Sequence, residues 1–322
     1  MAPRRVLVRL PNWLGDLLMS RPLLHALRSA LPGAHVTAVG VEASALLERE
    51  RLWDRWVRWP EVDARGPDER YDAALVLPPS FSSAWKLPRG IPTRIGFAED
   101  GRSWLLTHAV RRPARGALHL SEEYLRLGEP LGIAPVTLPT LAPLAAEIAS
   151  VGALRGRLGI PERPYAILAP GAVYGPAKRW PAERFVELGR RLAARSLAVL
   201  VCGAASDRAV ADPIAAAIGP QAHALAGVTS IGEQLALCAA ARVTITNDSG
   251  VAHVAAASGG TTVVLFGSTS SAWTAPLGPR VTVVQHAPVC APCFQRTCRI
   301  GYRCLTAIEV DEVERTVAEV AA

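Results

Sequence analysis

The residues best suited to chemistry lie in one short stretch, positions 246–253, which reads TNDSGVAH. An apolar run precedes it and an alanine-rich run follows it, a pattern typical of a buried strand, a tight turn and a helix. A helix start with unpaired backbone N–H groups favours an anion such as a phosphate. Asp248, Ser249 and Gly250 therefore form a candidate anion site, and His253 shares the helix face of Ser249. The alternative is an ordinary helix cap with a core histidine.

A second loop, positions 170–181 (PGAVYGPAKRWP), also follows an apolar run and precedes a helical pattern. Its glycines and prolines predict an irregular loop. The chain contains only two lysines, Lys86 and Lys178, whereas it contains many arginines. A lysine retained in this loop indicates that a compact positive charge is needed there, although a lysine at a loop tip is more often simply solvated.

A third element of the same kind opens the chain. Positions 5–10 (RVLVRL) predict a strand, positions 11–15 (PNWLG) a loop, and positions 16–31 an amphipathic helix. Asp16 lies at the predicted helix start, where the helix dipole stabilises a carboxylate. The same position, at the carboxyl end of a strand, suits a general base, so Asp16 is either a helix cap or a catalytic group.

Four motifs give the chain a family resemblance: PNWLGD near the start, LPPSFSSA at positions 77–84, the PGAVYGPAKRWP loop, and TNDSGVAHVAAA. Together they resemble the ADP-heptose:lipopolysaccharide heptosyltransferases of glycosyltransferase family 9. The GPAKRWP loop and the NWLGD opening are most similar to the heptosyltransferase II group. The resemblance implies an α/β protein of the GT-B class, with two Rossmann-like domains facing across a cleft. It also implies inverting transfer of L-glycero-D-manno-heptose from ADP-heptose to the lipopolysaccharide inner core.

The resemblance also implies roles for individual residues. Asp16 would be the general base, and Lys178 with the Ser249–Gly250 helix start would hold the donor diphosphate. Asp248 would orient the turn or the donor sugar, with support from His253. Further candidates are Gly171, Thr229 and Ser230 on the donor side, and Asn12, Trp13, Ser80 and Arg94 on the acceptor side.

The order of predicted elements supports two α/β domains. We expect an N-terminal, acceptor-side domain over positions 1–145 and a C-terminal, nucleotide-sugar-binding domain over positions 146–322. A proline-rich stretch at 131–143 is a plausible hinge. Strands are predicted at 5–10, 35–39, 73–77, 94–97, 166–169, 198–203, 242–246, 261–267 and 281–284, and helices at 121–128, 182–195, 251–258 and 311–320.

The formal net charge is +7, and basic residues concentrate between positions 86 and 115. They are Lys86, Arg89, Arg94, Arg102, Arg111, Arg112 and Arg115, against only Glu99 and Asp100. This cluster is either a solvated face or a patch for the acidic, lipid A-linked acceptor at an anionic inner membrane. We expect no nucleic-acid partner, because the arginines are not interleaved with stacking aromatics.

Other signals bear on location and cofactors. Positions 1–5 lead straight into a predicted strand, and no 18-residue apolar run occurs, so we expect a cytoplasmic protein peripheral to the inner membrane. An Asp-x-Asp motif is lacking, which indicates that helix starts, a lysine and hydroxyls meet the diphosphate charge without a required cofactor. A G-x-G-x-x-G fingerprint is also missing, which argues against NAD binding.

Four of the six cysteines lie close together in the sequence, at Cys290, Cys293, Cys298 and Cys304. In a cytoplasmic protein this spacing favours a structural metal site, for zinc or another metal, over a disulfide framework. Free thiols and a disulfide formed on oxidation are the alternatives.

Three other functions remain open. The first is a family 9 heptosyltransferase with a different core acceptor. The second is a sugar-nucleotide epimerase of similar fold, and the third is a non-catalytic nucleotide-sugar binding protein. Incubation with the donor alone separates the epimerase, because only an epimerase converts the donor sugar without an acceptor.

Overall fold

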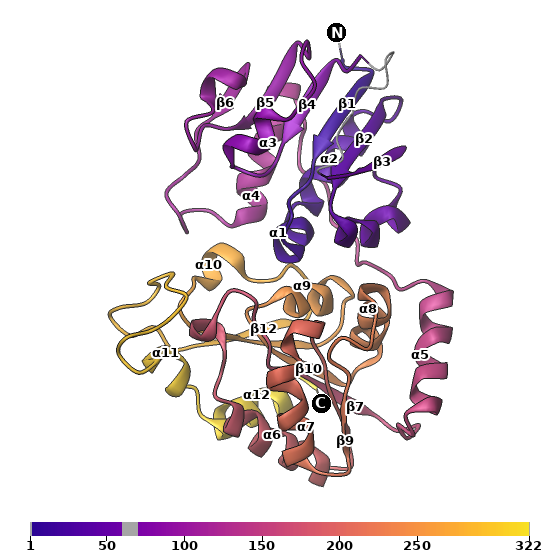
Figure 1. Cartoon of the computed structure of the whole chain (residues 1–322), viewed down its shortest axis with the longest axis vertical. Helices are drawn as coiled ribbons and strands as arrows, with labels where there is room; N and C mark the ends of the chain where they lie inside the picture. Colours follow the sequence, from indigo (N-terminus) through magenta and orange to yellow (C-terminus); the bar gives the residue numbers. More distant parts are fainter. Residues whose placement is uncertain (1, 60–69, 322) are drawn as a thin grey trace. The chain divides into compact units, whose positions relative to one another are not determined.

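The computed structural model describes residues 2–59 and 70–321. The chain divides into two compact units, Met1–Pro139 and Thr140–Ala322, whereas the sequence suggested a division after position 145. Figure 1 draws the first unit from indigo to magenta and the second through orange to yellow. Each unit contains its own sheet, and residues 133–144 form no helix or strand.

The N-terminal unit is built on a six-stranded parallel sheet in the order β3-β2-β1-β4-β5-β6. Its strands are β1 (Arg5–Arg9), β2 (His35–Gly40), β3 (Arg55–Arg58), β4 (Ala73–Val76), β5 (Thr93–Phe97) and β6 (His108–Val110). The central strand β4 is apolar and fully buried, and β1 buries every residue except Arg5, as expected of a parallel sheet covered on both faces. The strand order reverses between β1 and β4, so a ligand site is expected at their carboxyl ends.

The C-terminal unit repeats this topology, with the order β12-β11-β10-β7-β8-β9 and parallel pairing throughout. Its strands are β7 (Tyr165–Ala169), β8 (Ala198–Val201), β9 (Ala222–Ala224), β10 (Val243–Asn247), β11 (Thr262–Phe266) and β12 (Val281–Gln285). Here the order reverses between β7 and β10, which are the strands that precede the two candidate loops.

The helices of the N-terminal unit are short. They are α1 (Leu14–Met19), α2 (Arg21–Ala30), α3 (Phe81–Trp85) and α4 (Leu120–Leu125). The C-terminal unit has α5 (Ala145–Arg157), α6 (Ala182–Ala194), α7 (Arg208–Ile218), α8 (Ile231–Ala240), α9 (Gly250–Ala257), α10 (Ser271–Thr274), α11 (Arg303–Thr306) and α12 (Val310–Val320). Across residues 2–59 and 70–321, none of the helices combines the length and the apolar character needed to cross a membrane.

All nine predicted strands are present, but the sequence analysis missed β3, β6 and β9. These strands are only three or four residues long, and much of each is exposed, so they lack the apolar runs that mark the central strands. The single helix predicted over 16–31 was wrong. The chain forms α1 and α2 instead. The Ser20 backbone N–H ends α1 by donating to the carbonyls of Asp16 and Leu17, and Pro22 lies in the first turn of α2.

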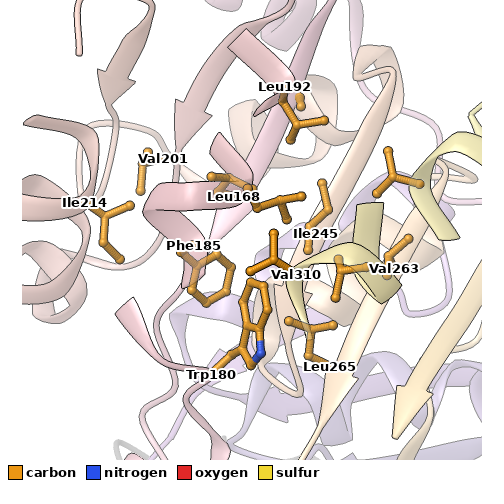
Figure 2. Close-up of a cluster of buried hydrophobic side chains, with 14 of the residues drawn as sticks. Leu168, Trp180, Phe185, Leu192, Val201, Ile214, Ile245, Val263, Leu265 and Val310 are labelled. Carbon is orange, nitrogen blue, oxygen red and sulfur yellow. The ribbon is translucent and has the colours of Figure 1, made fainter. Parts of the chain in front are cut away.

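The core of the C-terminal unit fixes the end of the Lys178 loop, which is the loop over residues 170–181. Figure 2 shows Trp180 and Phe185 among aliphatic side chains of the sheet and of α12. The two rings meet edge to face at 5.0 Å, and Trp180 Nε1 donates to the Ile308 carbonyl at 2.9 Å. Because Trp180 is fully buried and hydrogen-bonded, the loop that precedes it has a fixed end.

Candidate functional site

The N-terminal unit contains a pocket of about 570 Å³ at the carboxyl edge of its sheet, a size typical of small-molecule sites. Its lining comes from the segments that follow β1, β4 and β5, and from α4. The lining residues are Pro11, Asn12, Trp13, Asp16, Pro78, Pro79, Ser80, Glu99, Asp100 and Tyr124. The pocket therefore lies where the strand order reverses, and three of its residues are carboxylates.

Asp16 lies in the first turn of α1 and is half-buried in this pocket. Tyr124 of α4 lines the same pocket and is buried. Burial raises the pKa of Tyr124 well above its ordinary value, and the negative charge of Asp16 raises it further. A neutral phenol and a carboxylate thus share the pocket, an arrangement that suits proton transfer from a bound hydroxyl group to the carboxylate.

Arg102 supports one wall of the pocket. Its Nη1 donates to the carbonyls of Pro78 at 2.6 Å and Ser80 at 3.0 Å. The side chain is fully buried, and burial lowers the pKa of Arg102 to about 10. The sequence analysis assigned this arginine to a surface patch, but in the structure it is buried and binds the backbone of the loop that follows β4.

Three of the four acceptor-side candidates line the pocket with Asp16. Asn12, Trp13 and Ser80 do so, and Asn12 Oδ1 accepts a hydrogen bond from the buried Arg9 at 2.5 Å. Arg94 does not line the pocket; its Nη2 donates to the Ala84 carbonyl at 2.7 Å. The structure thus places Arg94 in loop support and not beside Asp16.

The predicted basic face is smaller than the sequence suggested. Besides Arg94 and Arg102, Arg112 is also internal, because it pairs with Glu99 at 3.1 Å and with the fully buried Glu123 at 2.5 Å. The pairing raises the pKa of Arg112 despite its burial. The exposed members of the run are Lys86, Arg89, Arg111 and Arg115.

In the C-terminal unit, the structure brings the two candidate loops together. Lys178 Nζ lies 2.5 Å from Asp248 Oδ2, and the Thr269 hydroxyl donates to the same oxygen at 2.6 Å. Lys178 is 13% exposed and Asp248 3%. Asp248 therefore fixes the ammonium group in place, a more specific role than orienting the turn. Thr269, which follows β11, was missed by the sequence analysis.

Asn247 ties these loops to each other. Its side chain is fully buried; Nδ2 donates to the Pro170 carbonyl at 2.7 Å, and Oδ1 accepts from the Trp180 backbone N–H at 3.0 Å. One amide thus binds both ends of the Lys178 loop to the end of β10. The sequence signal was present, because Asn247 belongs to the TNDSG motif, but its partners lie far away along the chain.

The residues of the predicted anion site lie at the start of α9. Ser249 is the N-cap residue, yet its side chain makes no capping hydrogen bond, and its hydroxyl lies 3.3 Å from that of Thr246. Gly250 is the first residue of the helix, and His253 is buried one turn later. The hydroxyl and the N-terminal N–H groups are thus placed beside the end of β10, where an anion would be favoured.

The other donor-side candidates have structural explanations. A Cβ at Gly171 would lie 2.2 Å from the buried Asp207 carboxyl group, so this position requires glycine for packing. Ser230 caps α8 through the Glu233 backbone N–H, and Thr229 contacts Gln234 at 3.5 Å. Among the described residues, no hydrogen bond or ion pair links Thr229 or Ser230 to the Lys178–Asp248 pair.

The cysteine cluster does not form a ligand set. Across residues 2–59 and 70–321, no group of three or more His, Cys, Asp or Glu side chains is placed to hold a metal ion, and the cysteines are free thiols. Cys304 is buried, which raises its pKa, whereas the Cys298 sulfur accepts from the Tyr302 backbone N–H at 3.3 Å. The positions of these cysteines therefore do not fit the structural metal site predicted from their spacing.

Comparison with known proteins places this chain among glycosyltransferases. Residues 67–303 match glycosyltransferase family 9 (heptosyltransferase). The chain is 32% identical over 308 residues to lipopolysaccharide heptosyltransferase 2 of Escherichia coli, which covers 87% of this chain and 88% of that protein. It is 31% identical over 306 residues to the Salmonella typhimurium protein of the same name, with the same coverage.

Solved structures agree with this assignment. The structure of the E. coli ADP-heptose LPS heptosyltransferase II is 29% identical and aligns with a TM-score of 0.83 over 98% of both chains. A family 9 glycosyltransferase from Veillonella parvula, at 20% identity, aligns with the same TM-score over 99% of this chain and 97% of that one, which shows the shared fold. These matches confirm the predicted α/β, GT-B fold class. The chain belongs to glycosyltransferase family 9 (heptosyltransferase).

Proposed function

We propose that this chain transfers L-glycero-D-manno-heptose from ADP-heptose to the lipopolysaccharide inner core, as a transferase of the heptosyltransferase II type. The observation that carries the proposal is the extended match to relatives named lipopolysaccharide heptosyltransferase 2. The structural match to the E. coli heptosyltransferase II covers 98% of this chain, so it extends over both units.

Asp16 is the general base of the proposed reaction. Its carboxylate accepts the proton of the acceptor hydroxyl group while that oxygen attacks the anomeric carbon of the donor. The bond from the anomeric carbon to the diphosphate oxygen breaks, its electron pair leaves with ADP, and the configuration at the carbon inverts. The position of Asp16 in a small-molecule-sized pocket supports this role.

Lys178 and the N-terminus of α9 bind the donor diphosphate and stabilise the departing ADP. The ion pair with Asp248 holds the Lys178 ammonium group in one position, so it can contact the diphosphate without reorganisation. In this proposal the reaction requires no metal ion or cofactor.

The proposed acceptor is linked to lipid A, so the protein works as a peripheral protein at the cytoplasmic face of the inner membrane. The exposed members of the basic run, Lys86, Arg89, Arg111 and Arg115, support contact with an anionic surface. The proposal includes no nucleic-acid partner.

A mass-spectrometric assay with ADP-heptose and defined core acceptors tests the function. The expected result is an acceptor product heavier by one heptose, with ADP released in equal amount. A reaction without acceptor is the control, because conversion of the donor sugar there would identify an epimerase instead. No product with any inner-core acceptor, from a folded protein that binds ADP-heptose, would contradict the proposal.

A further inference from the structure

The cysteine segment, residues 290–304, lies directly against the loop that contains Lys178. The Ala177 backbone N–H donates to the Arg296 carbonyl at 3.1 Å, and the Tyr174 hydroxyl donates to the Phe294 carbonyl. The Phe294 backbone N–H in turn donates to the Ser268 carbonyl at 2.8 Å. These bonds fix the backbone of Arg296 against the loop, although the two segments are far apart in the sequence.

Gly175 permits this close approach. Its φ of +146° is strained for residues with a side chain, and a Cβ there would lie 2.6 Å from the Arg296 carbonyl oxygen. Glycine is therefore required at position 175 because the backbone of the cysteine segment packs directly against it.

The side chains of Arg296 and Lys178 both lie near the aromatic ring of Tyr174. The Arg296 guanidinium carbon lies 5.5 Å from the centroid of the Tyr174 ring, and Lys178 Nζ lies 4.8 Å from the same centroid. Both distances suit cation–π contact. Arg296 is exposed, and no salt bridge with a described carboxylate occupies its guanidinium.

The charge balance at Lys178 calls for a second cation. The Lys178–Asp248 pair is close to neutral as a unit, because the two charged atoms lie 2.5 Å apart. A sugar-nucleotide diphosphate carries two negative charges, which a neutral pair and a helix N-terminus compensate only in part. Arg296 is the cation that the fold places on the same ring as Lys178, and a guanidinium suits bidentate contact with phosphate oxygens.

We propose that Arg296 is a second diphosphate-binding residue of the donor site, held in place by the Tyr174 ring. The inference rests on the proposed function, since it takes the donor to be a sugar-nucleotide diphosphate. It gives the cysteine segment a role in donor binding that requires no metal.

Calorimetric titration with ADP and with AMP tests the proposal in the full-length protein. We expect Arg296→Ala to weaken ADP binding by about 5–10-fold, the loss of one charge-assisted contact, and to change AMP binding much less. In kinetics, the donor KM should rise more than kcat falls. Arg296→Lys should recover part of the affinity. Arg299→Ala is the matched control, because Arg299 is an exposed arginine of the same segment without a described contact to Tyr174.

Two outcomes would overturn the role of Arg296 while leaving the proposed function intact. One is wild-type ADP affinity in Arg296→Ala. The other is an equal loss for AMP and ADP in Arg296→Ala, which would indicate a disturbed loop instead of a lost phosphate contact. Failure of the wild-type protein to bind ADP or to transfer heptose would instead contradict the proposed function itself.

Discussion

The two units of this protein share a strand order but differ in the charge that they place at the equivalent position. In the N-terminal unit, the order reverses between β1 and β4, and the pocket there contains Asp16, Glu99 and Asp100. In the C-terminal unit, it reverses between β7 and β10, and the loops there carry Lys178 and the start of α9. One scaffold thus supports a site suited to accepting protons and a site suited to binding phosphates.

The units also hold their loops by different means. A buried cation, Arg102, binds the carbonyls of the loop after β4. A buried neutral amide, Asn247, binds the loop after β7. The difference is consistent with the local charge, because Arg102 lies next to Glu99 and Asp100, whereas Asp248, the carboxylate at the C-terminal loops, is already paired with Lys178.

The largest expected effect tests the acidic side of this comparison. Asp16→Asn preserves size and hydrogen-bonding capacity but cannot accept the proton, so kcat should fall by about 10²–10⁴-fold. Thermal melting should stay close to wild type, and donor KM should change little. Asp100→Asn, in the same pocket, is the control and should retain most activity. Turnover within a few-fold of wild type in Asp16→Asn would leave Asp16 only a structural role.

The next effect concerns the cationic side. Lys178→Ala should weaken ADP-heptose binding about 10–100-fold, the typical loss of a charge-assisted contact. It should also lower the melting temperature, since an uncompensated buried carboxylate at Asp248 costs up to about 3–5 kcal/mol.

The double variant Lys178→Ala/Asp248→Asn separates these two effects. Its melting temperature should recover, because no buried charge is left unpaired, while donor affinity should stay low. Recovery of both stability and affinity in the double variant would show that Lys178 only neutralises Asp248.

A smaller effect tests how the loops are held. Asn247→Ala leaves the Pro170 carbonyl and the Trp180 N–H without their partner, at a cost of roughly 1–3 kcal/mol for each buried group. We expect a lower free energy of unfolding in denaturant titration and a raised donor KM, with the Asp16 pocket unaffected. Asn247→Asp is a useful companion, because it keeps one acceptor but adds a buried charge. Unchanged stability in Asn247→Ala would contradict the bridging role.

The smallest expected effect is that of metal removal. EDTA should leave the transfer rate nearly unchanged, since the proposed donor site consists of side chains and a helix start. Elemental analysis of protein kept reduced should find below about a tenth of an equivalent of zinc or iron, given how tightly structural sites retain metal. About one equivalent would instead restore the metal interpretation of Cys290, Cys293, Cys298 and Cys304. A strong loss with EDTA that Mg²⁺ rescues would contradict the metal-free donor site.

Local sequence patterns were sufficient to predict the central strands of both sheets and the chemical groups that follow them. Apolar runs predicted nine strands, and loop composition singled out Asp16, Lys178 and Asp248, because strand formation and loop chemistry depend on residues close together in the chain. The capping box of α8, from Ser230 to Glu233, is likewise a local pattern, although its hydroxyl was assigned to the nucleotide.

Contacts between groups that are distant in the sequence became apparent from the folded chain alone. It buried Arg102 and Arg112 from a run that looked like a basic surface, and it left the cysteines without a metal-ligand geometry in the part of the chain that it describes. It also placed Asn247 between Pro170 and Trp180, and Arg296 on the ring of Tyr174. These contacts follow from the order of the strands and the packing of loops at one edge of a sheet, and no local pattern of residue types encodes them.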